Sequence, residues 1–210
     1  MIATDALLIR LPAAANDAHK LGRLAAVAAD LLPDGSAPVS HCHIAHAAAE
    51  GQAYVYLHFA APQPLNAGVI TQLQHAMAAA NPETGGVRVS RLQKVFAATG
   101  ASTGEVPAFR YVVETDPETG WMPELGEWYD REHMPGLAAV PGCIHATRYL
   151  NHDGGPLSHA CYELVTEETK GSPLWLAMTH SEWSSRVRPH FTNTIRTMFT
   201  VAPTPSPGAL

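Results

Sequence analysis

The segment EWYDREHMPG, residues 127–136, places one imidazole between a charged, aromatic helix and a Pro-Gly pair. Pro135 has no amide hydrogen to offer the carbonyl of Arg131, and it disfavours helical geometry at Met134. The helix is therefore expected to kink or end near His133, whose ring would lie beside unpaired carbonyls. A helix C-terminus favours imidazolium, so we expect His133 to be protonated or near its switching point at neutral pH. It is a candidate general acid or base, unless it only caps helix carbonyls.

Aromatic side chains flank this histidine at helical spacing, at Trp121, Trp128 and Tyr129. Aromatic residues in such a pattern commonly belong to a hydrophobic core. Trp128 and Tyr129 would also form the wall of a pocket if the end of the helix borders a cavity. We therefore treat these two residues as candidate substrate contacts.

A second group of chemically active residues lies in SHCHIAH, residues 40–46. In a strand, His41 and His43 project from the same face, and a His-x-His pair can hold zinc, copper or iron if a third ligand converges on it. His58 would be that ligand only if its face agrees; otherwise the histidines simply line a polar face. Because no third ligand is evident, we expect no stoichiometric metal and no cofactor.

Polar residues also recur on the predicted strands of the second half. They are Arg110, His145, Arg148, His159, Glu163 and Arg196. Period-2 alternation places His145 and Arg148 on opposite faces, but it does not show which face is interior. Both faces mix polar and apolar residues, which is typical of a sheet enclosed on both sides. The alternative is a set of ordinary surface ion pairs.

Composition excludes several classes of partner. The net charge is −6 with only 13 Lys and Arg among 210 residues, and no basic run marks a nucleic-acid surface. No apolar run approaches the roughly 18 residues of a membrane span, and the first residues lack the pattern of a signal peptide. The cysteines, Cys42, Cys143 and Cys161, have no CxxC spacing. We therefore expect reduced thiols and a cytoplasmic location.

Apolar runs, helical periodicity and turn residues predict six elements in each half of the chain. In the first half they are a strand at 5–11, a helix at 16–32, strands at 39–46 and 53–60, a helix at 66–80 and a strand at 86–96. In the second half they are a strand at 108–115, a helix at 121–140, strands at 143–150 and 157–166, a helix at 172–188 and a strand at 190–201. Asn66 and Ser172 are the expected helix caps, and Pro123 and Pro173 suit a first helical turn.

Each half thus has the order strand, helix, strand, strand, helix, strand, which is the ferredoxin-like unit. We expect a degenerate unit at 1–97, a linker at 98–107, a second unit at 108–201 and a disordered tail at 202–210. One face of each four-stranded antiparallel sheet is left bare, and two such faces can stack within one chain. The predicted fold class is α+β, with tandem βαββαβ repeats whose sheets enclose a ligand space.

The second half resembles the EthD-like family of the dimeric α/β-barrel superfamily. The resemblance lies in W…EWYDREHMPGLAAVPGCIHATRY, from Trp121 to Tyr149, and W…EWSSRVRPHFTNTIR, from Trp175 to Arg196, and it extends over about residues 106–201. The first half matches only in element order and has no EHxP motif. The resemblance implies two ferredoxin-like units that form a barrel, here within one chain, around an interior pocket. The wider superfamily includes polyketide cyclases, muconolactone isomerases, monooxygenases and haem enzymes.

On this basis we expect a pocket protein for a small, aromatic or polyketide-like molecule, acting in catabolism by cofactor-free proton transfer as an isomerase, cyclase or lyase. His133 would be the acid or base, and Arg148 or Arg110 would hold an anionic oxygen. His145 and Arg196 are further candidate substrate contacts.

Two alternatives stay open at this point. One is a non-catalytic ligand-binding or stress-response protein with the same fold. The other is a metal- or haem-dependent enzyme that uses His41 and His43. The expected partner in each case is a small molecule, with a homodimer as one assembly and with neither nucleic acid nor membrane.

Overall fold

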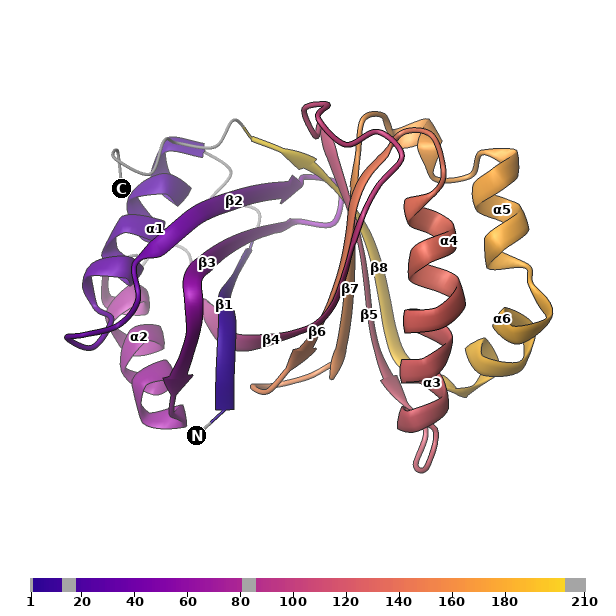
Figure 1. Ribbon diagram of the computed structural model, residues 1–210. Coiled ribbons are helices and arrows are strands. Elements are labelled where there is room, and N and C mark those ends of the chain that lie inside the picture. Colours follow the sequence, from indigo (N-terminus) through magenta and orange to yellow (C-terminus); the bar gives the residue numbers. More distant parts are fainter. Residues whose placement is uncertain (1, 13–17, 81–85, 203–210) are drawn as a thin grey trace. The chain divides into compact units, whose positions relative to one another are not determined.

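Residues 2–12, 18–80 and 86–202 are described by the computed structural model, and they fall into two units (Figure 1). Unit 1 comprises Met1–Gln93, Asn151–Gly154 and Thr200–Leu210, and unit 2 comprises Lys94–Leu150 and Gly155–Phe199. The boundary expected at residue 97 falls inside a strand. The expected tail, apart from Ala202, lies outside the described residues.

Unit 1 has a four-stranded antiparallel sheet with two helices on one face (Figure 1). Its elements are β1 (Ile2–Pro12), α1 (Ala18–Asp30), β2 (Val39–Ala47), β3 (Gln52–Leu65), α2 (Ala67–Ala80) and β4 (Arg88–Thr99). The strands follow the order β4-β1-β3-β2. Cys42 and Ile44 of β2 join Leu21 and Leu73 of the helices in one buried apolar cluster. Because strand residues alternate, the other face of β2 carries the intervening side chains.

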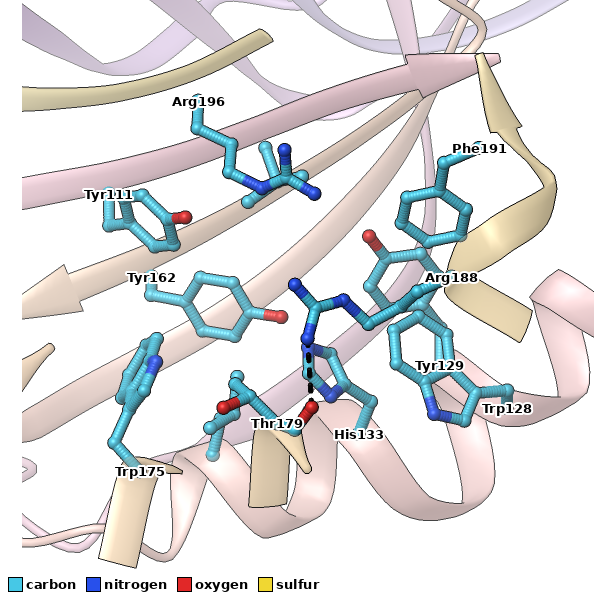
Figure 2. Close-up of a pocket in the computed structure, with 12 residues that line it drawn as sticks. Tyr111, Trp128, Tyr129, His133, Tyr162, Trp175, Thr179, Arg188, Phe191 and Arg196 are labelled. Atoms are coloured by element: carbon cyan, nitrogen blue, oxygen red, sulfur yellow. Dashed lines mark hydrogen bonds between the residues drawn. The ribbon is translucent and has the colours of Figure 1, made fainter. Parts of the chain in front are cut away.

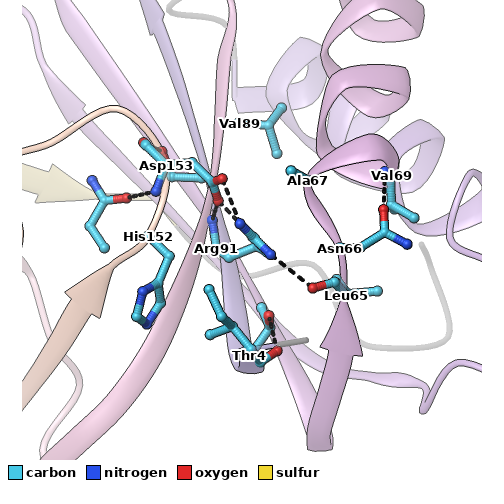
Figure 3. Close-up of polar contacts among 12 residues, drawn as sticks. Thr4, Leu65, Asn66, Ala67, Val69, Val89, Arg91, His152 and Asp153 are labelled. Carbon is cyan, nitrogen blue, oxygen red and sulfur yellow. Dashed lines mark hydrogen bonds and ion pairs between the residues drawn. The ribbon is translucent and has the colours of Figure 1, made fainter.

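A charged pair holds the segment Asn151–Gly154 to β4 within unit 1 (Figure 3). The carboxylate of Asp153 accepts hydrogen bonds from Nε and Nη2 of Arg91, both at 2.9 Å, and from the Arg91 backbone N–H at 2.8 Å. Nη1 of Arg91 donates to the carbonyl of Leu65 at 2.9 Å. The guanidinium of Arg91 is buried, and its donors are paired with the carboxylate of Asp153 and the carbonyl of Leu65. Hydrogen bonds of this kind stabilise a buried charge.

Unit 2 has a sheet in the order β8-β5-β7-β6, to which the end of β4 is added, and its helices lie on one face (Figure 1). Its strands are β5 (Phe109–Pro117), β6 (Cys143–Asn151), β7 (Ser158–Leu164) and β8 (Phe191–Val201). The helices are α3 (Met122–Trp128), the π-helical η3 (Tyr129–His133), α4 (Met134–Ala138), η4 (Glu167–Thr169), α5 (Pro173–Thr179), α6 (Glu182–Val187) and η5 (Arg188–His190). The predicted helix at 172–188 is thus two short helices, because Ser181 caps a second start.

The segment expected to be a linker is an ordered turn of unit 2. β4 continues to Thr99, and the following amides of Gly100 and Ser102 donate to the carbonyls of Ile144 and Cys143, both at 2.9 Å. A Cβ on Gly100 would overlap the backbone carbonyl of Cys143. Glycine therefore permits this close approach.

The helix that contains His133 does not end there. Helical backbone continues from Met122 to Ala138, and Met134 has φ −67° and ψ −47°, so the expected departure from helical geometry at Met134 is wrong. The chain instead widens into a π-helical turn, in which the N–H of Met134 donates to the carbonyl of Tyr129, five residues earlier. This wider turn accommodates Pro135, which has no N–H to continue the α-helical pattern.

The structure contains the helix caps and the free cysteine thiols that the sequence predicts. Val69 N–H donates to Asn66 Oδ1 at 3.1 Å, and Pro123 and Pro173 occupy first turns. The three cysteines are buried, and no disulfide joins them. Within the described ranges, no helix has the length and apolar character needed to cross a membrane.

Loss of the cap of α5 is expected to have a moderate effect on stability. Ser172 Oγ accepts the backbone N–H of Trp175 at 3.3 Å, so Ser172→Ala leaves that donor without its cap and should lower the free energy of unfolding by about 1 kcal/mol. Urea denaturation followed by tryptophan fluorescence measures the change. Ser185→Ala, on the exposed face of α6, is the matched control, and an equal loss in both variants would contradict the capping role.

Candidate functional site

Unit 2 contains a cavity of about 50 Å³ between the helix-covered face of its sheet and helices α3 to α6 (Figure 2). Its aromatic wall consists of Tyr111, Trp128, Tyr129, Tyr162, Trp175 and Phe191. Polar groups reach it from four elements: His133 in η3, Thr179 at the end of α5, Arg188 in η5 and Arg196 in β8. The cavity is therefore an aromatic box with one imidazole and two guanidinium groups.

Strand alternation and register build the sheet side of this box. Tyr111 of β5 lies directly opposite Tyr162 of β7, and their ring centroids are 6.2 Å apart. The indole of Trp175 packs edge-on against both tyrosines, at 6.0 and 5.3 Å between centroids. These rings pack against one another, and Trp175 also donates its backbone N–H to the cap of α5, so they form one continuous aromatic wall.

His133 occupies the helix side of the cavity. It is 8% exposed, and its ring stacks on Trp128 with centroids 4.1 Å apart. Burial first, and then the positive charge of Arg188, lowers the pKa of His133 to about 3. The expectation that His133 is protonated near neutral pH is therefore wrong, because desolvation outweighs the helix carbonyls. Its Nδ1 is buried and has no hydrogen-bond partner among the described residues.

Two arginines supply positive charge at the cavity. Arg188 is exposed, and its Nη1 donates to the carbonyl of Thr179 at 2.9 Å, which places its guanidinium beside the His133 ring (Figure 2). Arg196 of β8 is also exposed and reaches over the tyrosines of the sheet (Figure 2). A planar molecule with an anionic oxygen would match this combination of aromatic walls and cationic donors.

The structure brings together four of the residues selected from the sequence: Trp128, Tyr129, His133 and Arg196. They lie on the helix-covered face, so His133 does not point to the bare face that a second sheet was expected to cover. Sequence reasoning missed Tyr111, Tyr162, Trp175, Thr179, Arg188 and Phe191. The only available signal was the aromatic alternation of the two central strands, which does not by itself identify a face.

Three other selected residues lie apart from the cavity lining. Nη2 of Arg148 donates a hydrogen bond to Asp130 Oδ1 at 2.8 Å, and the Arg148 guanidinium lies 5.4 Å from the centroid of the Tyr129 ring. Arg148 therefore contacts two residues of η3 but does not line the cavity. Arg110 forms an ion pair with Glu163 at 3.0 Å on the opposite face of the sheet. His145 pairs in register with Glu163, and alternation places it on that same face.

The opposite face of the unit 2 sheet carries a buried polar row. His159 Nδ1 lies 3.2 Å from Glu114 Oε1. Burial lowers the pKa of His159, but Cys161 and Glu114 raise it to about 9 overall. Burial likewise raises the pKa of Cys161, whereas His159 and Arg110 lower it to about 7. Both side chains are almost fully buried, so this row is an internal charge network.

A third histidine joins the pair in SHCHIAH. β2 and β3 place His41 directly opposite His58, and the potential ligand atoms of His41, His43 and His58 all lie within 4.8 Å of one another. The premise that no third ligand accompanies His41 and His43 is therefore wrong. Unit 1 also has an open hollow of about 510 Å³ beside α2 and β4, but its acidic residue, Asp153, is already paired with Arg91.

Comparison with known proteins identifies the fold and goes no further. No protein family matches the sequence, and no curated protein matches it. A "putative monooxygenase" from Fusobacterium nucleatum has a similar structure, with a TM-score of 0.64, 8% identity and coverage of 97% of this chain and 95% of that one. An anthrone oxidase-like protein has a TM-score of 0.62 at 12% identity, with 97% and 93% coverage.

A ferredoxin-fold protein from Listeria monocytogenes, related to antibiotic biosynthesis monooxygenases, is also similar. Its TM-score is 0.52 at 10% identity, with 95% and 96% coverage. Together with the mixed α/β content, these likenesses show that the chain has a ferredoxin-like α+β fold.

Proposed function

We propose that this protein is a small-molecule enzyme that binds a planar aromatic anion in the unit 2 cavity and transfers a proton through His133. The observation that carries the proposal is the buried Nδ1 of His133, which has no hydrogen-bond partner among the described residues yet lines an aromatic, cation-edged cavity. A buried polar atom without a partner costs free energy, and a ligand that hydrogen-bonds to it recovers that cost.

The charge state of His133 suits a base that is activated by its substrate. A pKa of about 3 keeps the imidazole neutral at neutral pH, which is the form that accepts a proton. An anionic oxygen bound beside Arg188 would offset the charge that lowers this pKa. Because the charge of Arg188 is the smaller of the two causes, the pKa of His133 would then rise but stay below its ordinary value, and the base would become stronger when substrate is bound.

Binding requires a side chain to move. A volume of about 50 Å³ holds a few water molecules, whereas sites for small molecules commonly measure about 300–1,000 Å³. Arg188 is the side chain suited to this movement, because it is exposed and its hydrogen bond to the Thr179 carbonyl can be exchanged for one to an anion. The tyrosines and Trp175 would remain as the wall on which the ligand stacks.

The proposal includes the finer expectations from sequence. The chain would be an EthD-like member of the superfamily, with tandem βαββαβ units that close one barrel, and it would act in the cytoplasm as an isomerase, cyclase or lyase. The names of the fold neighbours, which include monooxygenase and anthrone oxidase-like, support an aromatic substrate.

Binding of an aromatic anion provides the first test. Naphthoate should quench tryptophan fluorescence, since Trp128 and Trp175 line the cavity, and Arg188→Gln should raise its Kd about tenfold by removing one charge-assisted hydrogen bond. Arg186→Gln is the matched control, because Arg186 is exposed and pairs with Glu124 away from the cavity. An unchanged Kd in Arg188→Gln, or no binding to the unaltered protein, would contradict the proposal.

A further inference from the structure

We propose that β2 and β3 of unit 1 form a three-histidine site for a divalent transition metal ion, with zinc as the preferred ion. The ligands are His41, His43 and His58, and the site is independent of the function proposed for the cavity in unit 2. Zinc accepts neutral imidazole nitrogens in tetrahedral geometry, and three histidines with one open position are the ligand set of a known class of catalytic zinc site.

The sheet itself brings the three rings together. His41 and His43 are two residues apart on β2, so they project from the same face, and His58 on β3 is the cross-strand partner of His41. The ring centroids of His41 and His58 are 4.2 Å apart, and those of His43 and His58 are 5.2 Å apart. Because antiparallel pairing fixes the backbones, the ligands are positioned without any loop having to fold around the ion.

Metal binding requires the rings to turn, because those of His41 and His58 are stacked with an interplanar angle of 8° and their nitrogens must converge on the ion. Around a zinc ion with Zn–N bonds of about 2.0–2.1 Å, tetrahedral nitrogens lie about 3.4 Å apart. The potential ligand atoms already lie within 4.8 Å of one another, so rotations about side-chain bonds can close the remaining gap. His41 is exposed, and His43 and His58 are half-buried, so the ion and a water molecule in the fourth position have access from solvent.

Ser40 lies where it can orient the ring of His41 for metal binding. Its hydroxyl donates to the backbone carbonyl of His58 at 3.1 Å and lies 2.9 Å from Nδ1 of His41. When the single hydroxyl proton is directed to the carbonyl, Oγ accepts from Nδ1–H of His41. The ring lone pair of His41 is then on Nε2, and such an outer hydrogen bond is the usual orienting contact of a metal-bound histidine.

The test uses the full chain, purified without a histidine tag, stripped by a chelator and titrated with Zn²⁺ against a competing indicator. We expect about one Zn²⁺ per chain. Either His43→Ala or His58→Ala should weaken the affinity by at least about 10²-fold, and Ser40→Ala by roughly tenfold, through loss of the orienting bond. His75→Ala, an exposed histidine on α2 of the same unit, is the matched control and should bind like the unaltered protein.

A second measurement does not depend on the variants. Co²⁺ added in place of Zn²⁺ should give the intense visible absorption of a tetrahedral site, and one equivalent of Zn²⁺ should remove it. Absence of stoichiometric Zn²⁺ binding would overturn the proposal. So would a loss of affinity as large in His75→Ala as in His58→Ala, or a Co²⁺ spectrum of the weak octahedral type.

Discussion

Replacing His133 with phenylalanine is expected to slow proton transfer by about 10²-fold or more, while the fold is kept. Phenylalanine preserves an aromatic ring over Trp128, where the imidazole now stacks with centroids 4.1 Å apart, but it removes both nitrogens. The measurement is deuterium uptake from deuterated water at the acidic carbon of an aromatic ketone, for which anthrone is a suitable probe. The rate is compared with buffer alone and with the unaltered protein.

His133→Ala is a less specific variant than His133→Phe. The ring is buried against Trp128, so its removal should itself cost about 2 kcal/mol of stability, in contrast to the small effect expected for a residue at an exposed helix end. The two replacements therefore separate packing from chemistry. If His133→Phe exchanges deuterium as fast as the unaltered protein, His133 is not the base. If the unaltered protein does not exceed the buffer rate, the cavity binds without catalysis.

Local patterns predicted the elements well, because caps and alternation are properties of neighbouring residues. Asn66, Ser172 and Pro123 mark helix starts that the structure contains. The same kind of reasoning failed at Pro135, where a missing N–H was taken to end the helix. A π-helical turn bridges that position, and Trp128 and Tyr129 at its start are buried.

The sequence predicts which residues share a site only where those residues lie on one secondary-structure element. Trp128, Tyr129 and His133 were found together because they share one helical segment. Tyr162 and Arg188 were missed, since only tertiary packing brings them to the same cavity. The low pKa of His133 was missed for the same reason, because it follows from burial and from the charge of Arg188.

The histidine cluster shows the same limit in a simpler form. His41 and His43 share a face by alternation alone, which the sequence predicts. Whether His58 joins them depends on the register between β2 and β3, and a shift of one residue would turn His58 to the other face. The structure supplies that register, with His41 opposite His58.

The second large effect is expected at the buried ion pair of unit 1. Asp153→Asn keeps the size of the side chain but leaves the buried guanidinium of Arg91 without its counter-charge (Figure 3). Breaking a buried pair from one side costs about 3–5 kcal/mol, so we expect the free energy of unfolding to fall by about 3 kcal/mol at neutral pH. Asp34→Asn, in an exposed turn of the same unit, should change it by less than about 0.5 kcal/mol.

The pH dependence of this effect identifies its cause. Burial raises the pKa of Asp153, but the hydrogen bonds and the charge of Arg91 together lower it by more. The pKa of Asp153 therefore lies below its ordinary value. A carboxylate with a lowered folded pKa stabilises fully above its unfolded pKa of about 3.9, and this contribution is lost as the pH falls through the folded value. Urea denaturation at pH values from about 7 to about 3 should therefore show the difference between Asp153→Asn and the unaltered protein shrinking in acid. If the difference in free energy of unfolding stays constant over this pH range, the loss is due to packing and not to charge. If Asp153→Asn changes the free energy of unfolding no more than Asp34→Asn does, the ion pair does not stabilise unit 1.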